Sequence, residues 1–208
     1  MSDDKKFQKD FDRQVKQIQG KISKVFTGCS PDSLYDPCKY IMDAGGKRIR
    51  PILVLFSCKA VSGSFNSAYN AALAIELIHN FTLAHDDIMD NADLRRGRDT
   101  VHKKYDISTA ILSGDNLIAI AYKYLLKDCK EGDNNIILDF TQGIIEVCEG
   151  QSLDKDYEIR SAVTIEEYIT MITKKTAALL ETCCSVGAKL GRGTEKEIKA
   201  LKSFGKNI

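Results

Sequence analysis

The chain has 208 residues, of which 43% are apolar and 28% are charged, a balance typical of one globular domain. Its formal net charge of +1 provides no global field for nucleic acid or an anionic membrane, so any anion site must come from local clustering of charge. No stretch reaches the roughly 18 uncharged apolar residues of a membrane span. Seven scattered cysteines without a CxxC pair indicate reduced thiols in a cytoplasmic protein.

The apolar residues follow a helical period along almost the whole chain. The first expected helix carries an apolar face made of Phe7, Phe11, Val15, Ile18, Ile22 and Val25. Ser30-Pro31 can open a second helix that stops at Gly45-Gly46, and Pro51 can start a third over residues 52–61. Segment 66–90 is apolar almost all round, which predicts a helix inside a bundle.

Further helices are expected at residues 107–127, 134–151, 165–190 and from 195 onward. Two of them begin with the capping-box patterns Thr164-x-x-Glu167 and Thr194-x-x-Glu197. No segment alternates between apolar and polar residues as a strand does. The expected fold class is therefore all-α.

Acidic residues stand at the end of the apolar segment 66–90. On a helix, Asp86 and Asp90 lie one turn apart on the same face, with Asp87 beside them. Two carboxylates on one face repel each other unless a cation lies between them, and oxygen-only ligands with gaps for water and phosphate suit Mg²⁺. The pattern favours a magnesium site over a solvated acidic helix end.

Two short basic segments flank this acidic run, Gly-Gly-Lys-Arg-Ile-Arg-Pro at 45–51 and Asp-Leu-Arg-Arg-Gly-Arg at 93–98. Arginine offers a bidentate fork for phosphate oxygens and lysine a point charge. Cations this close to carboxylates are explained if an anion bridges the two. His79, two turns before Asp86 on the same face, is a further candidate phosphate donor, and a buried core histidine is the plainer interpretation.

A fourth polar signal lies in the expected helix 165–190, where Lys174, Lys175 and Thr176 interrupt an apolar stretch. Gln151 and Asp154 form a weaker signal at the end of the preceding helix. Carboxylates for Mg²⁺, cations for diphosphates and an apolar shaft together predict a site that stabilises a diphosphate leaving group. Such chemistry needs charge stabilisation and no protein nucleophile.

In these segments the sequence closely resembles the trans-isoprenyl diphosphate synthases of the polyprenyl synthetase family. The resemblance runs from about Tyr40 to Ile208 and rests on GGKRIRP at 45–51, ELIHNFTLAHDDIMD at 76–90, LRRG at 94–97, GQSLD at 150–154 and KTAAL at 175–179. It implies an isoprenoid-synthase fold, a bundle of long helices around a deep central cavity, and a homodimer.

The resemblance also implies an activity and a set of roles. Mg²⁺-assisted loss of diphosphate from an allylic diphosphate gives a cation that the double bond of isopentenyl diphosphate attacks. The residues expected to bind isopentenyl diphosphate are Lys47, Arg50, His79 and Arg96. Those expected to bind Mg²⁺ are Asp86, Asp87 and Asp90, and those facing the allylic diphosphate are Arg95, Gln151, Lys175 and Thr176. Of these, the expected catalytic residues are Asp86, Asp90, Arg95 and Lys175.

Product length is expected to depend on the apolar side of the helix that carries Asp86. Phe81 and Thr82 lie about one turn below Asp86, where an aromatic ring can form a floor. This pair resembles enzymes that make geranylgeranyl diphosphate. The alternatives are a farnesyl or longer-chain synthase, a non-catalytic subunit of a heteromeric synthase, a class I terpene cyclase and a purely structural bundle.

Residues 1–208 are expected to form a single helical domain that stops before the second aspartate-rich motif of the family. Phe204-Gly205-Lys206-Asn207-Ile208 resembles the lead-in to that motif and contains no helix stop signal. We therefore expect this chain alone to be inactive or severely impaired, and the full-length protein to be active.

Overall fold

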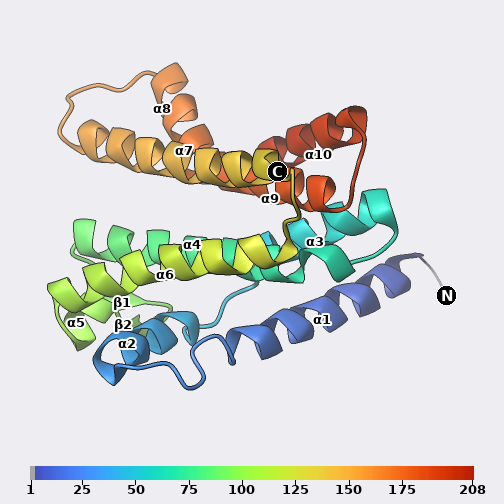
Figure 1. The fold of residues 1–208 in the computed structure, drawn as a ribbon. Coiled ribbons are helices and arrows are strands. Elements are labelled where there is room, and N and C mark those ends of the chain that lie inside the picture. The colour runs from blue at the N-terminus through green and yellow to red at the C-terminus, as the bar shows by residue number, and fades with distance from the viewer. Residues whose placement is uncertain (1–2) are drawn as a thin grey trace. The chain divides into compact units, whose positions relative to one another are not determined.

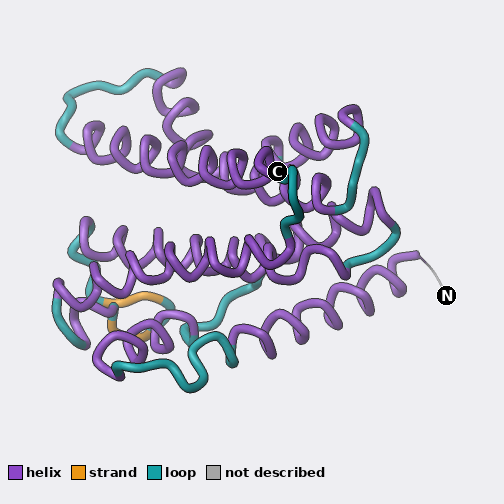
Figure 2. The backbone as a smooth tube through the Cα atoms, in the orientation of Figure 1, coloured by secondary structure: helices purple, strands orange, loops and turns teal. Residues whose placement is uncertain are grey.

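The structure is a computed structural model that describes residues 3–208. Most of these residues lie in helices joined by short loops (Figure 1). The described residues contain one small sheet, a two-stranded hairpin that Figure 2 shows in orange. The all-α fold class predicted from the helical period is therefore confirmed.

The helices of the described residues, in chain order, are α1 (Asp3–Ile22), α2 (Asp32–Met42), α3 (Ile49–Ser62), α4 (Tyr69–Met89), α5 (Val101–Lys104), α6 (Ile107–Asp128), α7 (Asn134–Glu158), α8 (Ile165–Ile172), α9 (Ala178–Leu190) and α10 (Glu195–Asn207). A 3-10 turn, η1 (Asn66–Ala68), leads into α4, and a π-helical segment, η2 (Thr173–Ala177), joins α8 to α9. The hairpin consists of β1 (Leu94–Arg95) and β2 (Arg98–Asp99). No helix of the described part is long and apolar enough to cross a membrane.

The chain divides into two compact units. The first unit comprises the chain up to Ile52 together with Leu73–Leu125. It therefore contains α1, α2, the hairpin, α5 and most of α4 and α6. The second unit comprises Leu53–Ala72 and Leu126–Ile208, and contains most of α3 together with α7 to α10.

The core of the first unit is centred on α4. Its residues Leu73, Ile75, Leu77 and Ile78 are at most 1% exposed, as expected of a helix that is apolar on all sides. The apolar face of α1 is buried toward its C-terminal end, where Ile18 is fully covered. This core surrounds the part of α4 that leads to the aspartates.

The second unit packs α7 closely against the helical rod formed by α8, η2 and α9. Both predicted capping boxes are present, because Thr164 accepts from Glu167 N and Thr194 from Glu197 N. Close approach of these helices depends on Gly143 and Gly150 of α7, because a Cβ at either position would collide with the facing helix.

Several element boundaries differ from the sequence-based predictions. Helix α2 ends at Met42 rather than at Gly45, because Gly45 and Gly46 have φ angles of 76° and 139° and already belong to the connection. Helix α3 begins at Ile49 rather than after Pro51. Pro51 lies in its first turn, where a missing N–H leaves no helical hydrogen bond unmade. Helix α7 continues to Glu158, seven residues past the predicted end at Gln151.

Candidate active site

The acidic end of α4 presents two carboxylates on one helix face. Asp90 N donates to Asp86 O at 2.9 Å, so the helical spacing extends through both residues. The Asp86 side chain is 18% exposed, and Asp90 is exposed. Among the residues that the structure describes, no three His, Cys, Asp or Glu side chains gather closely enough to hold a metal ion. Two carboxylates fit Mg²⁺, which proteins commonly hold by one or two carboxylates while substrate phosphates and water complete its shell.

Asp87 points to a different partner. Its carboxylate is buried and accepts a hydrogen bond from Arg95 Nε at 2.6 Å, while Arg95 Nη2 lies 3.3 Å from Asp86 Oδ2. Burial raises the pKa of Asp87 above its ordinary value, and the Arg95 hydrogen bond opposes this effect. Asp87 thus orients Arg95, and Asp86, Asp87 and Asp90 stay the predicted Mg²⁺ ligands.

The hairpin presents Arg95 and Arg96 to the site. Leu94 pairs with Asp99 and Arg95 with Arg98, which leaves Arg96 and Gly97 as a two-residue loop. Both loop residues have positive φ, 54° and 75°, as a primed hairpin turn requires. Arg96 is one of the few non-glycine residues in this region, and its Nη1 donates to Gly45 O.

Tyr40 on α2 holds the hairpin from the other side. Its hydroxyl donates to Asp99 O at 2.8 Å. The Arg98 guanidinium lies 4.4 Å and the Lys104 ammonium 3.8 Å from the centre of its ring. The aromatic ring thus fixes the strand that follows the Arg96 turn.

Arg48 lies inside the protein, although the sequence groups it with the exposed cations. It is 3% exposed, and its Nη1 donates to Glu76 Oε1 at 2.5 Å. It also donates from Nε to Gln19 Oε1 at 3.2 Å and from Nη2 to Met42 O at 3.2 Å. Asn80 Nδ2 donates to Glu76 O at 2.8 Å. This buried network fixes the connection between α2 and α3, so that the neighbouring cations have a defined orientation.

Three of the predicted cations, Lys47, Arg50 and Arg96, line a single hollow of about 350 Å³ together with His79. Its lining residues are Gly46, Lys47, Arg48, Ile49, Arg50, Glu76, His79 and Arg96. The Nε of Arg50 is buried without a hydrogen-bond partner among the described residues. The volume of the hollow is that of a small-ligand site. A phosphate group would satisfy this donor and offset the repulsion among the cations.

His79 is neutral at physiological pH. Burial, followed by repulsion from Arg50, lowers its pKa from 6.5 to about 3. Arg50 Nη1 lies 3.4 Å from His79 Nε2. Because a guanidinium only donates, Nε2 accepts and the ring proton sits on Nδ1. Neutral His79 can therefore donate one hydrogen bond to an anion from Nδ1.

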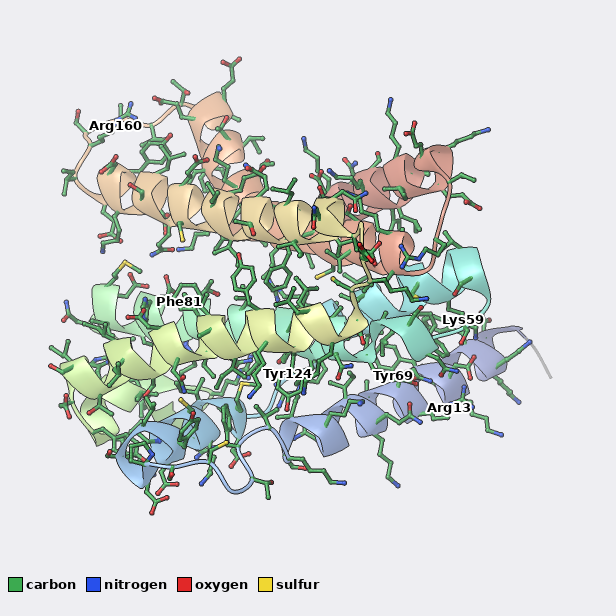
Figure 3. The ribbon with its side chains drawn as sticks, viewed as in Figure 1. Arg13, Lys59, Tyr69, Phe81, Tyr124 and Arg160 are labelled. Atoms are coloured by element: carbon green, nitrogen blue, oxygen red, sulfur yellow. The ribbon has the colours of Figure 1, made fainter. Side chains whose placement is uncertain are left out.

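Phe81 and Thr82 lie on α4, one turn before Asp86. Figure 3 labels the Phe81 side chain. Phe81 is 7% exposed, and its ring makes an edge contact with the His85 ring at 4.8 Å between centroids. The Thr82 hydroxyl donates to His79 O at 2.8 Å and is thereby satisfied within the helix. Only Phe81 of this pair presents an unbroken apolar surface.

The second unit brings together the other predicted group. Lys175 in η2 donates to Asp154 on α7, and Gln151 Nε2 is buried without a hydrogen-bond partner among the described residues. Thr176 follows in the same π-helical segment and is exposed. Lys175 and Gln151 both lie where α7 meets η2, and an ammonium and an amide N–H are both donors for an anion.

The structure also assigns roles that the sequence did not. Arg48, Glu76 and Tyr40 carry no predicted site role, yet they hold the segments that carry Lys47, Arg50 and Arg96. The sequence contains one signal of the buried Arg48–Glu76 pair. Glu76 is a charged residue within an otherwise apolar helix, and such a residue requires a buried partner.

Fold and sequence together define the family. Residues 31–208 match the family described as polyprenyl synthetase. The chain belongs to the polyprenyl synthetase family.

Relatives and solved structures agree with this membership. The chain is 40% identical over 193 residues to a geranylgeranyl diphosphate synthase of Methanosarcina mazei, covering 92% of this chain and 60% of the relative. It is 42% identical over 200 residues to a short chain isoprenyl diphosphate synthase of Methanocaldococcus jannaschii, covering 95% and 60%. The crystal structure of geranylgeranyl pyrophosphate synthetase from Pyrococcus horikoshii superimposes with a TM-score of 0.89 at 40% identity, covering 97% of this chain and 63% of that one. The chain thus spans about 60% of the length of these curated relatives.

Proposed function

We propose that the protein containing this chain is a prenyltransferase that condenses an allylic diphosphate with isopentenyl diphosphate, with geranylgeranyl diphosphate as product. The observation that supports it most is the arrangement within the first unit. Carboxylates of α4 contact Arg95, and the adjacent Arg96 lines a cationic hollow large enough for a diphosphate. One acidic and one basic site next to each other suit two diphosphate substrates.

Each proposed role follows from the chemistry of the side chain. Lys47, Arg50 and Arg96 would bind the diphosphate of isopentenyl diphosphate, and neutral His79 would donate from Nδ1. Arg95, oriented by Asp87, would stabilise charge on the departing allylic diphosphate. In the second unit, Gln151, Lys175 and Thr176 remain proposed ligands of the allylic diphosphate.

The reaction needs no nucleophile from the protein. The bond between the allylic carbon and the diphosphate oxygen breaks, and both electrons leave with the diphosphate. The double bond of isopentenyl diphosphate then forms the new carbon–carbon bond, and a proton from the adjacent carbon leaves to a diphosphate oxygen. Asp86 and Asp90 would hold Mg²⁺, which when bound supplies Lewis-acid stabilisation of the leaving group.

A class I terpene cyclase is the alternative that shares ionisation at such an aspartate motif. A cyclase needs no second diphosphate site, so a cyclase function would not account for the cationic hollow around Arg50 and His79. The two functions differ in one requirement, because only the prenyltransferase consumes isopentenyl diphosphate.

The test is an assay of the full gene product with radiolabelled isopentenyl diphosphate, Mg²⁺ and dimethylallyl, geranyl or farnesyl diphosphate. We expect label in a longer prenyl diphosphate and a loss of about 10²-fold or more in kcat for Asp90→Ala. Asp93→Ala is the matched control, because Asp93 is an exposed carboxylate that pairs with Lys103 at 2.8 Å. Turnover without isopentenyl diphosphate, or full activity of Asp90→Ala, would reject the proposal.

We further propose that the protein is a cytoplasmic homodimer. All seven cysteines are free thiols, which suits a reducing compartment. The first two turns of α6 form an apolar patch of three large side chains, Ile107, Ile111 and Leu112, which are 55%, 43% and 58% exposed. A second copy of the chain covering them would remove this surface from water.

A further inference from the structure

Gly150 on α7 lies directly against the backbone of η2. A Cβ atom at this position would sit 2.2 Å from Lys175 N, 2.6 Å from Lys175 Cα and 2.7 Å from Lys174 C. All three are backbone atoms of the π-helical segment, so no flexible side chain can move aside. The approach of α7 to η2 therefore requires glycine here.

Polar contacts surround this point of approach on both sides. Lys174 donates to Glu149, the residue before Gly150, and Lys175 donates to Asp154, one turn after it. Gln151, the residue after Gly150, has its buried Nε2 without a hydrogen-bond partner among the described residues. The closest backbone contact thus lies at the centre of the group that includes Lys175 and Gln151.

The π-helical turn explains why a close contact matters here. Such turns depart from the regular helical ladder and occur often at functional sites, and this one spans Thr173–Ala177 within an otherwise α-helical rod. The departure sets the direction in which Lys175 leaves the backbone. Contact with Gly150 holds the departing turn in one place.

We propose that Gly150 is a positioning residue for the allylic diphosphate site: its bare backbone lets η2 rest on α7, which fixes the backbone of Lys175 against the residue that precedes Gln151. This inference rests on the proposed function. A Cβ at Gly150 would have to retreat from Lys175 N by more than an ångström to reach an ordinary contact of 3.4 Å. A displacement of about 1 Å at a binding group is enough to lower catalysis by up to about 10²-fold.

Gly143 provides a matched control on the same helix, two turns earlier. A Cβ there would sit 2.1 Å from Thr182 Oγ1, so Gly143 also permits close packing of α7. Its neighbour is the side chain of Thr182 on α9, five residues past the end of η2, and not the backbone of η2. The Thr182 hydroxyl donates to Ala178 O at 2.8 Å. Gly143→Ala should therefore disturb the packing of α7 through a side chain, while the backbone of η2 at Lys175 keeps its contact with Gly150.

The experiment uses the full gene product as wild type, Gly150→Ala, Gly143→Ala, Lys175→Ala and the Gly150→Ala/Lys175→Ala double variant. Steady-state kinetics give KM and kcat for geranyl diphosphate and for isopentenyl diphosphate. Calorimetry gives the Kd of geranyl thiolodiphosphate, an unreactive analogue, with Mg²⁺. Thermal unfolding reports the packing cost of each substitution.

We expect both glycine variants to lower Tm, and only Gly150→Ala to raise KM for geranyl diphosphate and Kd of the analogue, by about tenfold or more. KM for isopentenyl diphosphate should stay unchanged. In the Lys175→Ala background, Gly150→Ala should add less than about twofold, because the two substitutions remove the same interaction.

Three results would overturn the inference: an unchanged Kd in Gly150→Ala, an equal effect of Gly143→Ala, or full additivity with Lys175→Ala. If Gly150→Ala does not fold, deletion of Thr173 shortens η2 while keeping Gly150, and it should weaken analogue binding in the same way. Wild-type analogue affinity in the deletion variant would equally contradict the role. Absence of prenyl transfer in the wild type would instead reject the proposed function.

Discussion

The charge of His79 is determined by its surroundings. Buried next to Arg50 and near the other arginines of the hollow, it has a pKa of about 3 and is neutral in the folded protein at pH 7. It therefore adds a hydrogen-bond donor to the site without adding a further positive charge to an already cationic hollow.

This lowered pKa predicts acid sensitivity. The unfolded chain binds a proton at His79 below its ordinary pKa of 6.5, and the folded protein does not until about pH 3. Stability is thus unaffected above pH 6.5 and is lost progressively as the pH falls toward 3. Between pH 7 and pH 5 we expect a loss of about 2 kcal/mol in unfolding free energy from this residue.

Urea denaturation of ligand-free wild type and His79→Gln at both pH values checks this. The variant should lose less stability on acidification by about the same amount. An identical pH dependence in the two proteins would show that His79 is not the titrating group.

Phe81 carries the proposed limit on product length. Its ring is buried and contacts the ring of His85. Phe81 lies one turn before Asp86, where a prenyl tail would extend along α4. Phe81→Ala should shift the products to longer chains, measured by chromatography of the dephosphorylated alcohols. Phe26→Ala is the control, because Phe26 is also buried in the same unit and its ring makes a tilted contact with Tyr35. Unchanged chain lengths in Phe81→Ala would remove Phe81 from this role.

Arg48 shows what a sequence pattern cannot reveal about a residue. Three cations within four positions predict an anion site, and the structure brings Lys47 and Arg50 to one hollow. The direction of Arg48 depends on Glu76, 28 positions away, and on its own positive φ of 54°. Local sequence contains neither the distant partner nor the backbone angle, so the inward turn of Arg48 could not be predicted.

At the scale of elements, the hairpin depends on the turn at Arg96-Gly97. Gly97 has a φ of 75° with open space around its Cα, so Gly97→Ala should cost about 1 kcal/mol through backbone strain alone. Because the hairpin carries Arg95 and Arg96, we also expect weaker binding of inorganic diphosphate with Mg²⁺, measured by calorimetry.

Gly132→Ala is the matched control for this turn. Gly132 has a φ of 88° and equally open space, in the connection before α7. Gly132→Ala should lower the free energy of unfolding about as much as Gly97→Ala does, measured by thermal unfolding. It should leave the affinity for diphosphate unchanged. Equal loss of affinity in both variants would show that the hairpin has no special part in binding.

The long helices were predictable because their apolar residues repeat over many turns. The hairpin and α5 were missed, since two-residue strands and a four-residue helix are too short to show any period. The π-helical segment was also missed, because one irregular turn leaves the apolar pattern of residues 165–190 nearly intact. Capping boxes were predicted correctly at both Thr164 and Thr194, since their pattern is local.

At the scale of the whole molecule, the proposed homodimer can be tested on α6. Ile111→Glu places a charge within the apolar patch of Ile107, Ile111 and Leu112. If a second copy covers this patch, the substitution should weaken self-association by about tenfold or more. Sedimentation velocity over a range of concentrations measures this. Leu138→Glu is the control, because Leu138 is 67% exposed on α7 and lies outside the apolar patch of α6. A wild type that sediments as a monomer would contradict the proposal.

The first turn of α4 is stabilised by a residue from the far end of α6. Asp128 accepts hydrogen bonds from Asn70 N at 2.7 Å and Ala71 N at 2.8 Å, 58 and 57 positions earlier in the chain. A carboxylate at a helix start neutralises its exposed amide groups. On the ribosome, the helix that presents Asp86 and Asp90 therefore stays uncapped until Asp128 has emerged, which ties its maturation to the synthesis of α6.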